Sequence, residues 1–519
     1  MRNIDFSYRF DTWVKTAMLA FFMVVIAMIT GIAVNAGSLI IPGALVALMV
    51  FTFIYTIFGK GGDPEAVLLG LLTFGYIVGS RGFAALSLSA AAPVYVGEVT
   101  VMACFATFVF RMAFTKGRLV PPNSLGWTVA LFLVIGAVRF AVDVYEAHPR
   151  SLRDIRDIAR DFAMVYYAAV FFIAYHIGLR EGSRRFFLGI LNIAFILLLP
   201  SFGLQVFFSD IYQPISIRGI PVILHKGDLV SAFLAAGSIY FFVTSRRSGH
   251  RLMWIFLSMA LFWLFAYGPA RAALVGLIAA NCFLLLARRG RIVKYQAIYA
   301  IIGVIVVLLI SPILKNKDED NVLLRVAEKT MTIFDVYGNG SYRLNASASS
   351  LQNTRFRQVW WENVYDETME KSPIFGLGFG YDLSARFLRN YPVPLGDDFD
   401  ARSPHSYLFS IFGRLGFVGL LAFLAIVFQI VLLAFRYASE VRKTKTFGSG
   451  LALWTALIII LLSACFGVVL EGPMAAIPFW TFLGLVASER VGTQSRNDRR
   501  TEPSRVAGNV APRLPNSQV

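Results

Sequence analysis

Charged residues are scarce in this chain, and their scarcity excludes an ordinary soluble protein. Only 15% of the 519 residues are Asp, Glu, Lys or Arg, whereas 57% are hydrophobic and the mean hydropathy is +0.66. Soluble domains carry about 25% charged residues. The deficit falls in apolar runs of roughly 20 residues, which is the length that crosses a bilayer. The composition therefore predicts an integral membrane protein with many spans.

Cysteine is also scarce, which excludes a disulfide framework. Cys104, Cys282 and Cys465 each lie inside an apolar run, far from one another, and are expected to be small buried hydrophobic residues. Acidic residues are fewer than basic ones, so the net charge is +17. In a membrane protein this excess is expected in cytoplasmic loops rather than at a nucleic-acid site. No internal repeat is evident.

The apolar runs predict an all-α polytopic membrane protein with about 12–14 transmembrane helices and one large, partly helical extracytoplasmic loop. The run at 64–81 is the weakest and could be re-entrant, and the run at 406–435 is long enough to begin outside the membrane. The predicted spans are 15–35, 38–58, 64–81, 94–113, 124–143, 159–179, 185–207, 226–244, 250–268, 270–288, 293–313, 406–435, 449–468 and 472–488.

Basic connections between these spans predict the orientation. With fourteen spans, five such connections fall on the same side as both termini, and cytoplasmic loops are the ones that collect Lys and Arg. Both termini are therefore expected in the cytoplasm. The expected division is a transmembrane bundle at 1–313, an extracytoplasmic loop at 314–404, further transmembrane helices at 405–489 and a disordered tail at 490–519. The basic connections are Arg111–Arg118, Arg180–Arg185, Arg246–Arg251, Arg288–Lys294 and Arg436–Lys445.

Other basic residues fall on the opposite, extracytoplasmic side. An anionic ligand such as a lipid phosphate or pyrophosphate would explain them. The alternative is that they pair with Asp154, Asp157 and Asp161 or extend to lipid headgroups. These residues are Arg150, Arg153, Arg156, Arg160, Arg218, His225, Lys226, Arg271, Arg355, Arg357, Arg402 and His405.

Arg271 is predicted to begin a helix at the membrane boundary. Gly268 and Pro269 form a short turn between two spans, and proline suits the first turn of a helix. The free N–H groups of a helix start favour an anion, and a guanidinium adds a two-pronged donor that fits phosphate. Bonding of Arg271 to carbonyls of a neighbouring helix is the alternative.

The long loop holds a second group of candidates. The stretch from Asn353 predicts an amphipathic helix to about Lys371, stopped by Ser372-Pro373, and the glycines of 376–380 predict a turn rather than a nucleotide cradle. His405 lies just before a membrane span. A neutral imidazole there could take a proton from a sugar hydroxyl.

These stretches, in this order, resemble the O-antigen ligase and O-antigen polymerase superfamily of bacterial envelope glycosyltransferases. The resemblance covers about residues 220–435, and at His405-Ser406 the chain has serine where many members have asparagine. The motifs are Gly268–Leu274, the Arg357–Trp361 spacing, Ser372–Gly380, Ser403–Tyr407 and Gly413–Gly419.

The resemblance implies a C-type glycosyltransferase-like fold and an inverting transfer without metal or other cofactor. A glycan would pass from undecaprenyl pyrophosphate to an acceptor hydroxyl on the outer face of the bacterial inner membrane. The family's roles map onto Arg271 and Arg357 as pyrophosphate-binding residues and onto His405 as the general base. Arg355 is the alternative to Arg357, and weaker candidates are Arg402, Arg414 and Arg218.

Two acidic features invite other interpretations. Asp398 and Asp400 form a pair of the kind that binds a divalent cation in other glycosyltransferases, although the resemblance and the usual solvation of acidic loops argue against a metal. Asp228 lies within a membrane segment, where an ionisable residue suggests function: sugar binding, pairing with Arg271, or helix capping.

Two other function classes stay open. A flippase of lipid-linked oligosaccharide needs many spans and charges, but inverted repeats are not evident. A peptidoglycan polymerase would carry motifs that this chain lacks. Within the preferred class, the acceptor could be another glycan, lipid A–core or a protein, so ligase, polymerase and protein O-oligosaccharyltransferase are not distinguished. Besides the donor, the expected partners are the acceptor and membrane lipids, and no nucleic acid.

Overall fold

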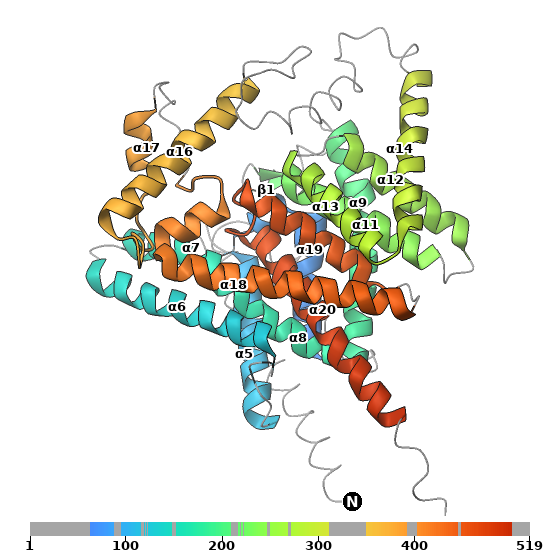
Figure 1. Ribbon diagram of the computed structural model, residues 1–519, viewed down its shortest axis with the longest axis horizontal. Coiled ribbons are helices and arrows are strands. Elements are labelled where there is room, and N and C mark those ends of the chain that lie inside the picture. Colours follow the sequence, from blue (N-terminus) through green and yellow to red (C-terminus); the bar gives the residue numbers. More distant parts are fainter. Residues whose placement is uncertain are drawn as a thin grey trace, which may run out of the picture.

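The structure is a computed structural model that describes residues 63–87, 95–115, 119, 121, 123–147, 152–208, 216–217, 220–221, 223–245, 250–267, 271–310, 349–391, 402–444 and 448–500. Helices dominate it (Figure 1). The helices are α3 (Pro64–Val78), α4 (Arg81–Ala84), α5 (Val96–Thr115), α6 (Ser124–Ala147), α7 (Leu152–Tyr166), η1 (Tyr167–Ala169), α8 (Val170–Leu179), α9 (Glu181–Phe207), α11 (Gly227–Ser245), α12 (Arg251–Tyr267), α13 (Arg271–Leu286), α14 (Gly290–Ile310), α16 (Ser349–Lys371), α17 (Ala385–Asn390), α18 (Tyr407–Thr444), α19 (Gly450–Cys465) and α20 (Pro473–Arg500), and a small hairpin joins β1 (Ser216–Ile217) to β2 (Ile220–Pro221).

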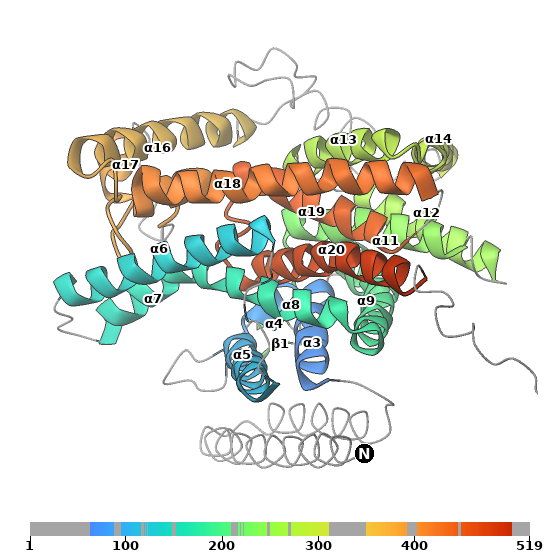
Figure 2. The same ribbon diagram turned by 60° about the horizontal axis from the view of Figure 1, so that its bottom comes forward.

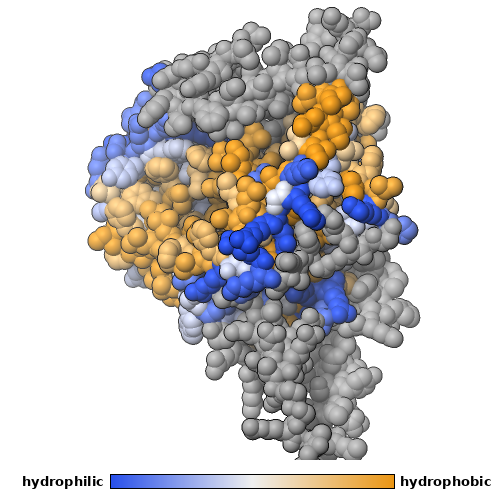
Figure 3. Space-filling model, turned by 45° about the vertical axis from the view of Figure 1, so that its right-hand side comes forward, coloured by the Kyte–Doolittle hydropathy of each residue, from blue (hydrophilic) through white to orange (hydrophobic). Residues whose placement is uncertain are grey.

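The prediction of an all-α polytopic membrane protein is confirmed. Every predicted span from 64 onward coincides with a helix, while the spans at 15–35 and 38–58 lie outside the described residues. Within the described part of the chain, four helical stretches are long and apolar enough to cross a membrane, and shorter apolar helices accompany them: Ser124–Glu146, Arg156–Leu179, Glu181–Phe207 and Tyr407–Lys443. Hydrophobic side chains also cover a large part of the surface shown in Figure 3. Helix α20 runs to Arg500, past the predicted start of the tail at 490.

Close helix packing builds the core of the bundle. Helix α8 approaches α20 at Gly484, where an added Cβ would lie 2.6 Å from the carbonyl oxygen of Phe171. Helix α13 approaches α19 in the same way, since a Cβ on Gly276 would lie 2.8 Å from the Cα of Ile459. Small residues at these crossings allow the backbones to pack closely, as is usual between membrane helices.

Basic residues from several of the predicted cytoplasmic connections gather at one end of the bundle. Arg111 pairs with Glu65 at 2.6 Å, and Arg184, from the next connection, pairs with Glu489 of α20. Arg289, from a third connection, donates to the carbonyl of Val441, which lies in the Arg436–Lys445 connection, at 2.8 Å. Arg289 follows the C-terminal end of α13. The basic end of the bundle is therefore opposite the end at which α13 begins with Arg271.

Helix α18 is broken at Gly416. Gly416 has φ 62° and ψ −158°, which interrupts the helix. The ring centroids of Tyr407 and Phe423 are 4.9 Å apart, although an unbroken helix would separate these residues by about 24 Å. The segment before Gly416 therefore folds back along the segment after it. The apolar run predicted at 406–435 is thus two helical segments, and its first part does not extend away from the bundle.

Helices α16 and α17 form a separate small layer over the N-terminal part of α18 (Figure 2). Trp360 and Phe387 stack with centroids 4.7 Å apart at an interplanar angle of 6°. The Trp360 indole also donates to the carbonyl of Leu383 at 2.9 Å. This small core fixes α16 at the end of the bundle opposite to the basic connections.

Candidate active site

His405 lies in a turn that α16 supports. Its φ of 54° places it in the left-handed region, which non-glycine residues rarely adopt. The imidazole packs edge-on against Trp360, with centroids 5.7 Å apart, and the indole of Trp361 donates to the carbonyl of Pro404 at 2.6 Å. Aromatic residues of α16 thus hold both the turn and the ring.

The turn is also held by Glu471, which lies between α19 and α20. One carboxylate oxygen of Glu471 accepts hydrogen bonds from Ser403 at 2.7 Å and from Ser410 at 2.6 Å. Burial raises the pKa of Glu471, and the two serine hydrogen bonds oppose that rise. Ser403 is two residues before His405, so Glu471 is a positioning residue for the histidine turn.

Arg357 and Arg271 both lie at the level of the C-terminal end of α19. The Nη1 of Arg357 donates to the carbonyl of Phe466, directly after α19, at 2.7 Å. Helices α13 and α19 run antiparallel, because Gly276 packs on Ile459 and Phe283 on Trp454. At this register Arg271, the first residue of α13, lies level with Cys465. The two arginines come from segments 86 positions apart in the sequence.

Lys226 adds a third cation at the same end. It caps α11, since its carbonyl accepts from the backbone N–H groups of Leu229 and Val230, both at 3.1 Å. Helices α11 and α12 are antiparallel, with Ser238 and Ser258 bonded across them, so α11 begins at the end where α12 finishes and α13 starts.

The electrostatic environment keeps His405 neutral. Burial is the largest cause, and the positive charges of Arg357 and Lys226 act in the same direction, so the pKa of His405 is lowered from 6.5 to about 4. An imidazole without its proton can accept one. The two helix starts at α11 and α13 and these cations make this end of the bundle a favourable place for an anion.

The glycine-rich segment after α16 packs on the broken part of α18. Leu377 donates to the carbonyl of Gly413 at 2.7 Å, and Val418 donates to that of Ile374 at 3.1 Å. A Cβ on Gly416 would lie 2.4 Å from the carbonyl oxygen of Ile374, so only glycine permits this approach. The segments 372–380 and 413–419 therefore pair with each other through their backbones.

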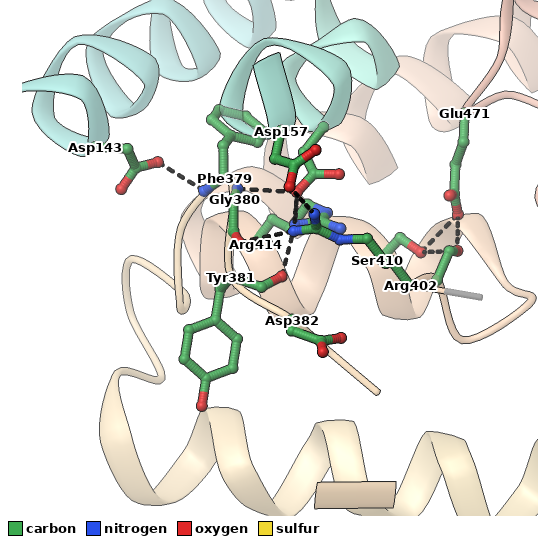
Figure 4. A network of polar contacts seen from close by, with 12 residues as sticks. Asp143, Asp157, Phe379, Gly380, Tyr381, Asp382, Arg402, Ser410, Arg414 and Glu471 are labelled. Carbon is green, nitrogen blue, oxygen red and sulfur yellow. Dashed lines mark hydrogen bonds and ion pairs between the residues drawn. The ribbon is translucent and has the colours of Figure 1, made fainter. Parts of the chain in front are cut away.

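Arg402 and Arg414 take part in a structural ion-pair network (Figure 4). Arg402 pairs with Asp157 at 2.7 Å, and Arg414 pairs with Asp161 at 2.6 Å. Asp161 also accepts from the backbone N–H of Gly380 at 2.9 Å. Both candidates pair with aspartates, which for Arg402 is the alternative considered above. The network ties the glycine-rich segment to α7 and α18.

We predict that Arg414→Met destabilises the protein by about 3–5 kcal/mol, because it leaves Asp161 as a buried charge without its main partner. Arg414 is 3% exposed. The thermal midpoint of the detergent-solubilised protein measures the effect. Asp161→Leu combined with Arg414→Met removes both charges and is expected to restore most of the loss; a single variant as stable as the wild type contradicts the prediction.

The remaining candidates are placed as follows. Arg355 is exposed on α16, two positions from Arg357 and so on nearly the opposite side of the helix. Asp228 is the second residue of α11, but its side chain is outside the described part, as are Arg218 and the pair Asp398 and Asp400. Among the described residues there is no group of three or more His, Cys, Asp or Glu placed to hold a metal.

Two residues of this site were not selected as site residues from the sequence. Lys226 had a signal, since it is a basic residue on the unexpected side of the membrane. Glu471 had only a weak signal, because Glu471-Gly472-Pro473 resembles any turn before a helix. Its role depends on a contact with Ser403, 68 positions away in the chain, which sequence patterns do not report.

Comparison with known families matches the central part of the chain. Residues 260–424 match the family model described as O-Antigen ligase. The match contains Arg271, Arg357 and His405, and both paired segments, 372–380 and 413–419. A search of curated proteins found no match.

Proposed function

We propose that this chain, whose residues 260–424 match the family model described as O-Antigen ligase, transfers a glycan from undecaprenyl pyrophosphate to an acceptor hydroxyl, with inversion and without a metal ion. The observation that carries the proposal is the convergence of Arg271 and Arg357 on the C-terminal end of α19, in a site that includes His405. This transfer needs cations that stabilise the leaving pyrophosphate and a neutral base that takes the proton of the acceptor hydroxyl.

The cations would stabilise the leaving group. When the bond between the sugar and the pyrophosphate breaks, negative charge grows on the departing phosphate oxygen. Guanidinium groups already held in place stabilise that charge without reorganising, and one such donor contributes about 3–4 kcal/mol. Lys226 is the third candidate for this role, through a point charge rather than a two-pronged contact.

His405 would act as the general base. The acceptor hydroxyl must lose its proton as its oxygen attacks the anomeric carbon, and a neutral imidazole can receive that proton. With its pKa lowered to about 4, the imidazole is neutral near pH 7 before the donor binds. The bound pyrophosphate would offset the charges of Arg357 and Lys226 and so raise the pKa of His405 toward neutrality, which makes it a stronger base when it is needed.

We also propose the membrane orientation that this reaction requires. The end that carries His405 would face outward from the bacterial inner membrane, and the end with the basic connections, together with both termini, would face the cytoplasm. The support is that Arg111, Arg184 and Arg289 gather at one end, opposite Arg271.

The purified protein in nanodiscs, supplied with undecaprenyl-pyrophosphate-linked repeat units, tests the proposal. A ladder of longer lipid-linked glycans from the donor alone would identify a polymerase. Product that forms only with lipid A–core would identify a ligase, and product only with a polypeptide would identify a protein O-oligosaccharyltransferase. Absence of product with all three acceptors, together with movement of the donor between leaflets, would contradict transfer and favour a flippase.

The pH dependence of the reaction reports on His405 directly. We predict that kcat/KM, which reflects the free enzyme, stays constant as the pH falls from neutrality and decreases only near pH 4, the pKa of His405. The decrease in kcat is expected at a higher pH, because the bound pyrophosphate raises the pKa. Initial rates across this range measure both; a kcat/KM that halves near pH 6.5 contradicts the prediction.

A further inference from the structure

Exposed apolar side chains mark the surface that faces lipid. On α18 they recur every three or four positions from Phe417 to Phe435, so that they share one face of the helix. These positions span about 27 Å, close to the roughly 30 Å thickness of the hydrocarbon layer. The residues of this face are Phe417, Leu421, Leu424, Phe428, Val431 and Phe435, all between 40% and 63% exposed.

The apolar surface continues beyond Gly416 onto the segment that follows α16. The backbone N–H of Val418 donates to the carbonyl of Ile374 at 3.1 Å, so this segment lies directly against the start of the lipid-facing helix. Ile374 is 55% exposed and Phe375 is 61% exposed. Large hydrophobic residues with this exposure would be unfavourable in water.

Helix α16 extends the same patch. Tyr365 stacks on Phe412 with centroids 5.9 Å apart, and Phe412 contacts Phe417 at 5.1 Å. Tyr365 and Met369 are 47% and 39% exposed and lie one turn apart. We call Tyr365, Met369, Ile374 and Phe375 the apolar tip.

The flank of α16 next to the apolar tip is charged. Glu370 pairs with Arg386 at 2.6 Å, and Lys371 pairs with Glu367 at 2.7 Å. Asp366 is exposed next to Tyr365. A helix end with one apolar face and one charged face is the arrangement that lies in a membrane interface, with the charges at the headgroups.

Helix α6, which packs along α18, shows where the apolar tip lies along the direction that crosses the membrane. Ser124 bonds Gln429 at 2.9 Å, and Phe132 packs on Phe423, so the two helices are antiparallel. At this register Val138 is level with Phe417, yet the exposed apolar face of α6 continues to Val142. The lipid-facing band thus extends past the level of Phe417, which is the level at which Ile374 sits.

We propose that the apolar tip inserts into the lipid leaflet at the His405 end of the bundle. The occupant of the patch is bilayer lipid, because the patch is continuous with the lipid-facing surface of α18 and lies within the height of the apolar band. The insertion anchors α16, and therefore Arg357 and the aromatic residues around His405, at a fixed height above the membrane. It does not depend on the reaction that the protein catalyses.

Site-specific fluorescence in lipid tests the insertion. The exposed or half-exposed cysteines are removed by Cys282→Ala and Cys465→Ala, while Cys104, 1% exposed, stays. An environment-sensitive fluorophore is attached to Phe375→Cys and, as the matched control on the charged side, to Asp366→Cys. The labelled proteins are placed singly in nanodiscs whose lipids carry a nitroxide quencher on the acyl chain, below the headgroup region, and aqueous iodide is the second quencher.

Insertion predicts that the nitroxide lipid removes most of the emission at position 375 and little at position 366, with the reverse order for iodide. Equal iodide quenching at both positions without nitroxide quenching would overturn the proposal. Protection from both quenchers at position 375 would mean that protein covers the tip, and would also overturn it. Ile374→Cys replaces Phe375→Cys if the latter does not elute as a single species.

Discussion

Replacing His405 with alanine is expected to reduce glycan transfer by about 10²–10⁴-fold, the usual contribution of a general base. The loss should appear in kcat, because the imidazole acts on the acceptor proton in the transition state and adds little to donor binding. Transfer rates with saturating lipid-linked donor measure it, in protein of equal abundance and thermal midpoint.

Ser403→Ala is the matched comparison for His405→Ala. It removes one of the two serine hydrogen bonds to Glu471 but keeps the imidazole. A modest decrease in kcat is expected, since Ser410 still bonds Glu471. If His405→Ala transferred glycan at the wild-type rate, the assignment of His405 as the base would be wrong.

Arg357→Ala is expected to slow transfer by about 10²–10³-fold, corresponding to 3–4 kcal/mol of lost leaving-group stabilisation. Arg357→Lys should recover only part of the loss, because an ammonium cannot make a two-pronged contact with phosphate. The same variant also tests the coupling to His405. Removing one of the two cations that lower its pKa should move the decrease in kcat/KM to a higher pH.

Arg355→Ala serves as the control for Arg357→Ala. It lies two positions away on the same helix and is exposed, so its removal should leave transfer nearly unchanged. Activity lost in Arg355→Ala and kept in Arg357→Ala would overturn the assignment and make Arg355 the phosphate-binding residue.

The structure agrees with several local features predicted from sequence, for local physical reasons. Pro269 predicted a helix that starts near Arg271, and α13 begins there. Ser372-Pro373 predicted the end of a helix near Lys371, where α16 ends. Proline removes a backbone donor and fixes φ, so its effect on nearby backbone is readable without knowledge of the fold.

The sequence by itself therefore determined the class of protein and many of its helix boundaries. Apolar runs long enough to cross a bilayer predict membrane helices, because no backbone N–H or C=O can remain unpaired in hydrocarbon. The family resemblance likewise indicated Arg271, Arg357 and His405 as a group. Its motifs, however, could not distinguish arginines that pair with aspartates from arginines at the proposed site.

Only the tertiary structure decided which charges meet. The break at Gly416 folds Tyr407 back beside Phe423, and Arg402 and Arg414 are thereby used in pairs with Asp157 and Asp161. The charge of Lys226 acts on His405 because α11 and α13 begin at the same end. Each of these contacts joins residues far apart in the chain, and the free energy of a charge depends on which partner lies within a few ångströms of it.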